Sequence, residues 1–199
     1  IIEIWEQFKK VKVGISLDGL HGRVGYIRYP TDFDTVEKNL WRLEKTSDKI
    51  KTNIALAVQI LNIKHVPDFI KWKVKSGFKK LNFEKNAAGQ TAGGGLCGVH
   101  LLWIPTWLSL RVLPPADKLD VINRFNELRQ WLWDNYTQDA EFWEVNPYGW
   151  KRWEGIIDWM LAEDHTNLLP DFREYITTMD RQRGTDFKAT FPEIAHLLS

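Results

Sequence analysis

Strand-like and helix-like segments alternate along the first part of this chain, and this alternation restricts the fold more than any other feature. Residues 11–17 predict a strand, because apolar residues occupy the odd positions and Asp18-Gly19 follow. The predicted order is strand, helix, strand, helix, strand, at residues 11–17, 33–45, 52–60, 67–76 and 78–84. Strands separated by helices pair in parallel through right-handed βαβ crossovers, so we expect an α/β fold.

The later part of the chain is mostly helical in pattern. Residues 108–113 are a candidate fourth strand, which Pro114-Pro115 would end. Beyond them apolar residues recur at helical spacing, and the predicted helices are 116–136, 151–162, 168–183 and a short one starting at Phe191. We therefore expect a partial α/β barrel in residues 1–114 and a helical region packed on it in residues 115–199.

The composition excludes several classes of protein. The formal net charge is only +1, so no strong field attracts nucleic acid, and we expect neither a nucleic-acid nor a membrane partner. No apolar stretch approaches the ~20 residues that a membrane-spanning helix needs. The single cysteine, Cys97, excludes an internal disulfide and an internal multi-cysteine metal site, and it favours a reducing, cytoplasmic compartment.

Ligand chemistry is expected where the strands end, because the carboxyl edge of a parallel sheet is the reactive one. The polar residues that should share this edge are Ser16, Asp18, Arg28, Gln59, Asn62, Glu84 and Asn86. Asp18 fits either a plain turn or a ligand contact. Arg28 fits either a carboxylate or phosphate ligand, or an ion pair with Asp18 or Asp32.

Two other interpretations use different residues. Asp18 and Glu84 could act as the carboxylate pair of a glycosidase-like hydrolase. The eleven tryptophans favour core packing, but exposed indoles would make a non-catalytic binding module. The histidines show no metal-ligand spacing, and no nucleophile elbow is present, so we assign no metal ligand and no catalytic residue.

Several segments resemble the radical S-adenosylmethionine proteins that carry a small "twitch" region at their C-terminal end. They are ISLDG, GRVGYIRYP, DFDTVEKNLWRL, NIALAVQILNIKHVPDFIKW, LSLRVLP and DFREYITTMDRQRGTDFKATFPEIAHLL. The resemblance covers nearly the whole chain, and YIRYP combined with the DRQRG and FPEI ending is its most specific part.

The resemblance implies a partial (β/α)6 barrel and reductive cleavage of S-adenosylmethionine by a [4Fe–4S] cluster, which gives a 5′-deoxyadenosyl radical that abstracts hydrogen from a substrate. It implies that Ser16 contacts the ribose or amino-acid part of S-adenosylmethionine, Arg28 its carboxylate, and Gln59 the methionyl or ribose moiety. Asp18 would shape this site or face the substrate, a small molecule or a peptide.

The family binds its cluster through CxxxCxxC, since three thiolates leave one iron open for S-adenosylmethionine. This sequence has no such motif, so we expect no cluster in this chain. The chain also starts inside a helical pattern without Met. We therefore expect the first three βα units, with the cysteines, to precede Ile1 in a longer parent enzyme, and this piece to be inactive by itself.

Overall fold

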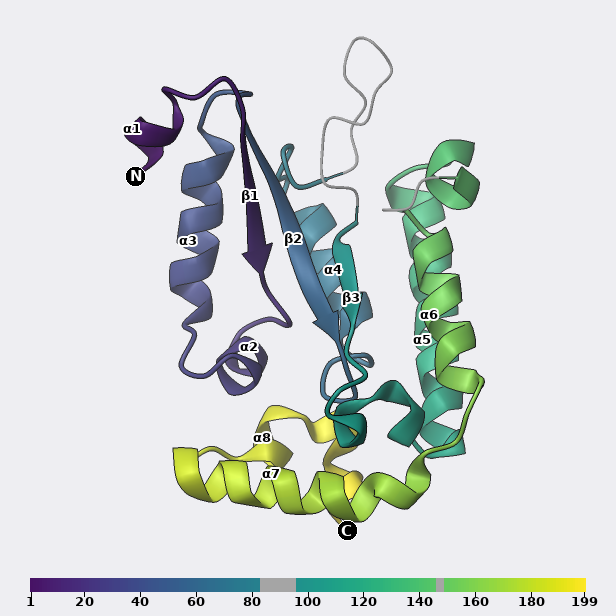
Figure 1. Ribbon diagram of the computed structural model, residues 1–199. Coiled ribbons are helices and arrows are strands. Elements are labelled where there is room, and N and C mark those ends of the chain that lie inside the picture. Colours follow the sequence, from purple (N-terminus) through teal and green to yellow (C-terminus); the bar gives the residue numbers. More distant parts are fainter. Residues whose placement is uncertain (83–95, 146–148) are drawn as a thin grey trace.

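A computed structural model describes residues 1–82, 96–145 and 149–199 of the protein. The structure is mixed α/β and contains an open, three-stranded sheet (Figure 1). Its strands, in spatial order, are β1 (Val11–Ser16), β2 (Ile50–Val58) and β3 (Gly98–Leu101). Both pairings are parallel, which confirms that expectation from the sequence.

Eight α-helices lie within the described residues: α1 (Ile2–Trp5), α2 (Gly22–Ile27), α3 (Phe33–Glu44), α4 (Val66–Lys75), α5 (Pro115–Asn135), α6 (Lys151–Leu161), α7 (Leu169–Arg183) and α8 (Phe187–Thr190). The remaining helical segments, of 3₁₀ or π type, are η1 (Thr106–Leu108), η2 (Leu110–Val112), η3 (Glu141–Val145), η4 (Thr166–Leu168) and η5 (Pro192–Leu198). Local signals set several boundaries. Asp32 caps α3 by accepting a hydrogen bond from the Thr35 N–H at 2.9 Å. Gly184, at φ +64°, ends α7 in the left-handed conformation that glycine adopts without strain.

The two faces of the sheet differ in character. On β2 the residues at even positions are buried and those at odd positions are only partly buried. Helices α3 and α4 stand on the far side of the sheet in Figure 1, where they cover the apolar face. The opposite face carries small or polar residues, which are Lys12, Gly14, Ser16, Lys51, Asn53, Ala55, Ala57, Gly98 and His100. No described helix lies in front of β1 and β2 on this open face.

The two edges of the sheet also differ. The Leu17 N–H donates to the Ala55 carbonyl of β2, and the Val11 N–H donates to the Lys49 carbonyl just before β2. The backbone groups of Lys12, Gly14 and Ser16 therefore point away from β2. The other edge is covered, because Arg152 of α6 donates from Nη2 to the Val99 carbonyl of β3 at 3.1 Å. Within the described residues, β1 is therefore the edge left open for pairing.

Two strand predictions were wrong. Residues 78–82 form a turn, because the Glu44 carboxylate accepts hydrogen bonds from the N–H groups of Lys79 and Lys80, which a neighbouring strand would otherwise use. The rest of that predicted strand, Phe83 and Glu84, lies outside the described residues.

The candidate strand at 108–113 consists of two helical turns, η1 and η2, joined at Ser109. The Ser109 hydroxyl accepts a hydrogen bond from the Arg111 N–H at 3.2 Å and so begins η2. The third strand is instead β3, at Gly98–Leu101, where the sequence analysis predicted no strand.

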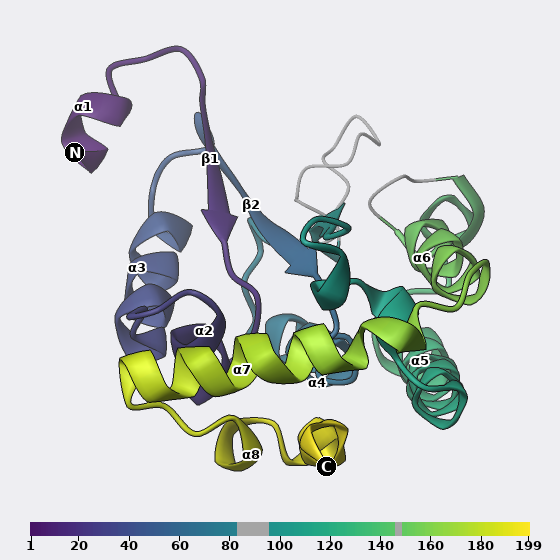
Figure 2. The same ribbon diagram turned by 60° about the horizontal axis from the view of Figure 1, so that its bottom comes forward.

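The helices that end the chain lie at the carboxyl ends of the strands. Figures 1 and 2 show α7 crossing near the carboxyl ends of the strands, with α8 behind it in Figure 1 and below it in Figure 2. Helices α5 and α6 stand beside β3, and Trp143, Trp150 and Trp153 are buried against them. These three indoles belong to the core, as the packing interpretation predicted. A search of the described helices finds none with the length and apolar character needed to cross a membrane.

Candidate functional site

A buried polar network joins the carboxyl ends of β1 and β2. Asn62 donates from Nδ2 to the Asp18 carbonyl at 3.0 Å and to the Ala57 carbonyl at 2.8 Å. Its Oδ1 accepts from the Gln59 N–H at 2.9 Å. The Asp18 carboxylate accepts from the Ala57 N–H at 2.7 Å. The sequence predicted these residues at one edge, and the structure brings Asp18, Gln59 and Asn62 together there.

Arg28 lies beside this network. Its Nε is 2.6 Å from Asp18 Oδ2, so the arginine pairs with Asp18 and not with Asp32, which caps α3. Asp18 is buried, whereas 36% of the Arg28 side chain is exposed. The buried Asp18 carboxylate therefore fixes the position of the guanidinium, while the Arg28 side chain stays partly exposed to solvent. No second ion pair of Arg28 occurs within the described residues.

Ser16 and Gln59 occupy different environments. Ser16 ends β1 on the open face and is exposed. Gln59 follows β2 directly and is buried, and its Oε1 has no hydrogen-bond partner in the described part of the chain. A buried acceptor without a donor is costly, so Gln59 Oε1 is an atom that a bound donor would satisfy.

The C-terminal segments close this edge through contacts that the sequence analysis missed. Arg23 of α2 pairs with Glu193 at 2.9 Å. Lys64, which follows β2, is buried and pairs with Asp117 at 2.5 Å and with Asp120 at 2.9 Å. The sequence analysis assigned no role to Lys64, which follows Ile63 directly in the segment between β2 and α4.

The motifs that carry the family resemblance pack against each other. Asp180 of the DRQRG motif accepts hydrogen bonds from the Tyr26 hydroxyl at 2.8 Å, the Thr185 hydroxyl at 2.7 Å and the Phe187 N–H at 2.9 Å. Tyr26 belongs to YIRYP, and its ring contacts Phe191 edge-to-face at 5.1 Å between centroids. In this structure the two motifs join α2 to the C-terminal helices.

Burial shifts the pKa of other groups near the sheet. It lowers the pKa of His65 to about 4, with a smaller contribution from the positive charge of Arg23. It lowers the pKa of Lys73 to about 7 and raises that of Cys97 to about 12. Lys73 donates a hydrogen bond to the Leu96 carbonyl. Cys97 is therefore a buried, protonated thiol.

The chain does not fit an iron–sulfur cluster. Cluster ligands are thiolates, and the one cysteine is buried and protonated. Across residues 1–82, 96–145 and 149–199 no three His, Cys, Asp or Glu residues form a group suited to a metal ion. Glu84, the second carboxylate of the glycosidase hypothesis, lies outside the described residues, and Asp18 is committed to Arg28 and Ala57.

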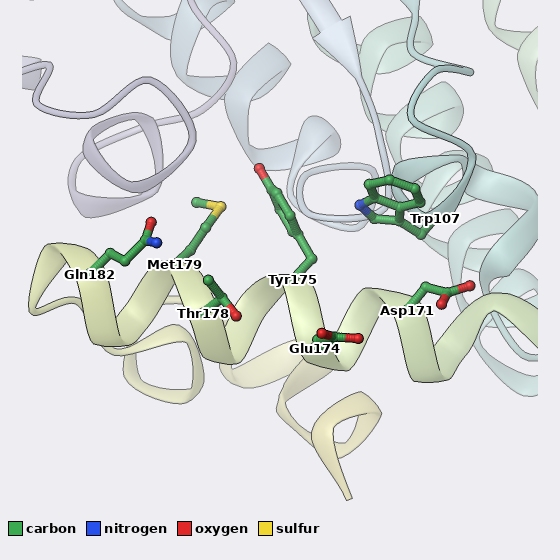
Figure 3. Close-up of a pocket in the computed structure, with 7 residues that line it drawn as sticks. All are labelled: Trp107, Asp171, Glu174, Tyr175, Thr178, Met179 and Gln182. Atoms are coloured by element: carbon green, nitrogen blue, oxygen red, sulfur yellow. The ribbon is translucent and has the colours of Figure 1, made fainter.

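A separate cavity of about 340 Å³ lies against α7 (Figure 3). Its lining comes from α7 and from Trp107 of η1. The α7 side chains form two adjacent rows at helical spacing, one with Asp171, Glu174 and Thr178 and the other with Tyr175, Met179 and Gln182. In Figure 3 the second row points toward the sheet. The sequence analysis did not identify this cavity, although both rows can be found from their spacing.

Comparison with known proteins gives no relatives. No family model matches the chain, and no match is found to a curated protein or to a solved structure.

Proposed function

We propose that this chain forms the later βα units of a radical S-adenosylmethionine enzyme, and that Ser16, Arg28 and Gln59 bind S-adenosylmethionine there. The main support is the position of β1. It is an open parallel edge strand whose carboxyl end carries the Ser16 hydroxyl, followed by the buried Asp18 carboxylate that pairs with the partly exposed Arg28. An incomplete barrel needs such an edge, because the preceding βα units pair with it.

The open face of the sheet agrees with this proposal. In a barrel this face would become the inner wall, and small or polar residues there leave room for a ligand. The residues on β1 and β2 nearest the carboxyl edge are Ser16, Ala55 and Ala57, so no bulky side chain of these strands fills the space.

The residues present suit S-adenosylmethionine. The Arg28 guanidinium, on a partly exposed side chain, would pair with the ligand's carboxylate, while Asp18 fixes the orientation of the arginine. The unpartnered Gln59 Oε1 would accept a hydrogen bond from an ammonium or hydroxyl group, and the Ser16 hydroxyl would contact the ribose. Bound to a reduced cluster, this cofactor supplies the 5′-deoxyadenosyl radical. We place the cluster outside residues 1–199.

The experiment uses the whole open reading frame that contains this chain, expressed without oxygen. We expect a CxxxCxxC motif upstream, about four iron and four sulfide per chain, and release of 5′-deoxyadenosine after reduction. Arg28→Ala should raise the KM for S-adenosylmethionine at least tenfold, because it removes hydrogen bonds to a charged group. Arg42→Ala on the exposed surface of α3 is the matched control. Absence of the cysteines, or no 5′-deoxyadenosine from an iron-loaded protein, would refute the proposal.

A further inference from the structure

The charged and aromatic side chains that line the cavity on α7 indicate which kind of ligand it can bind. Asp171 and Glu174 are exposed carboxylates one helical turn apart, and neither makes an ion pair within the described residues. Asp171 lies in the first turn of α7, where a negative charge is favourable by itself. Glu174 lies beyond that turn and has no such explanation. The two charges together favour a cation with two or more donors.

The second row on α7, together with Trp107 of η1, gives the cavity an aromatic wall. The ring centroids of Trp107 and Tyr175 are 6.4 Å apart, and Met179 continues this surface along α7. Indole and phenol faces attract cations, and the planar guanidinium group stacks on them better than a compact ammonium. An arginine side chain would therefore contact the aromatic wall with its stem and plane while its N–H groups reach the carboxylates.

One polar atom of a lining residue has no hydrogen-bond partner among the described residues. Trp107 Nε1 is buried and donates no hydrogen bond to the described residues. Figure 3 shows this nitrogen on the side of the indole that faces Tyr175 and the cavity. A buried indole N–H without an acceptor is costly, so a ligand that offers a carbonyl oxygen beside its cation would satisfy it.

We propose that this cavity binds an arginine side chain presented by a peptide. Asp171 and Glu174 accept from the guanidinium, Trp107 and Tyr175 contact its plane and stem, and the Trp107 N–H donates to a neighbouring peptide carbonyl. The volume of about 340 Å³ suits one side chain with its flanking backbone. This site does not depend on the proposed radical chemistry, because its residues lie on α7 and η1.

The test is a titration of the ¹⁵N-labelled chain with N-acetyl-arginine N-methylamide, followed through the indole N–H signals. Trp107→Phe identifies the signal of interest among the eleven tryptophans. We expect that signal to shift saturably. N-acetyl-norleucine N-methylamide has an apolar stem without the charge and should produce no saturable shift. Free arginine lacks the two amide groups that flank the side chain in this probe, so it should bind more weakly than the probe.

The carboxylates are tested with Asp171→Asn/Glu174→Gln, both at exposed positions where the fold tolerates change. Losing two exposed ion pairs should weaken binding about tenfold, at about threefold for each pair. Glu127→Gln, on the exposed side of α5, changes the net charge in the same direction and should leave the affinity unchanged. Equal binding of the norleucine probe, equal weakening by Glu127→Gln, or no shift of the Trp107 signal would each overturn the proposal.

Discussion

Replacing Asn62 should test whether its amide holds the strand ends together. Asn62→Ala removes three hydrogen bonds and leaves the carbonyls of Asp18 and Ala57 and the N–H of Gln59 without partners. Asn62 is 1% exposed, so water does not replace the amide. At about 1 to 1.5 kcal/mol for each bond, the free energy of unfolding should fall by about 4 kcal/mol. Domains are typically stable by only about 5–15 kcal/mol.

Urea denaturation followed by tryptophan fluorescence measures this loss. With a slope of about 2 kcal/mol per molar urea, the midpoint should fall by about 2 M. Asn62→Asp keeps the size and one acceptor but loses both donors, so it should be at least as destabilising as alanine. Asn39→Ala, at an exposed position of α3, should change the midpoint little. If Asn62→Ala moved the midpoint by less than about 0.5 M, or if the aspartate behaved like the asparagine, the network would not be the link between the strands.

Three further predictions concern the same structure. Tyr26→Phe removes one hydrogen bond to the Asp180 carboxylate and should cost about 2 kcal/mol of unfolding free energy in urea, whereas exposed Tyr29→Phe should cost almost nothing. The pKa of His65 is lowered in the folded protein, so the free energy of unfolding should fall by up to about 3 kcal/mol as the pH falls from 6.5 toward 4. In thermal melts over this pH range, His65→Gln should lose less stability than the unchanged chain. The same pH dependence in both proteins would contradict the prediction. The buried Cys97 thiol, with its raised pKa, should not react with Ellman's reagent at pH 8 until urea unfolds the chain, and rapid reaction of the folded protein would show that the thiol is accessible.

The elements that the sequence predicted well carry their own local signals. The strand at β1 shows alternation, α3 has the Asp32 cap, and α4 ends just before Gly77, whose φ is +79°. β3 carries no such signal. It has four residues, and its conformation depends on pairing with Ala55–Val58 of β2. A strand fixed by a distant neighbour cannot be found from a short window of sequence.

The same distinction between local signals and contacts with distant residues applies to the candidate functional site. Asp18 and Arg28 are ten residues apart, and their ion pair was one of the alternatives that the sequence left open. Lys64 and Asp117 are 53 residues apart, and Tyr26 and Asp180 are 154 apart. Local pattern shows which of these residues are polar but does not show which partner each one meets. The roles in binding S-adenosylmethionine stay predictions.

The Arg23–Glu193 ion pair has a consequence for how the protein is made, since its two residues are 170 positions apart. During synthesis, α2 emerges long before the segment from Phe187 to Leu197, which covers Tyr26 in the folded protein. The nascent chain therefore exposes an unfinished apolar surface until the segment from Phe187 to Leu197 has left the ribosome. Slow translation of the codons between α2 and this segment should lengthen the interval and increase the demand for chaperones.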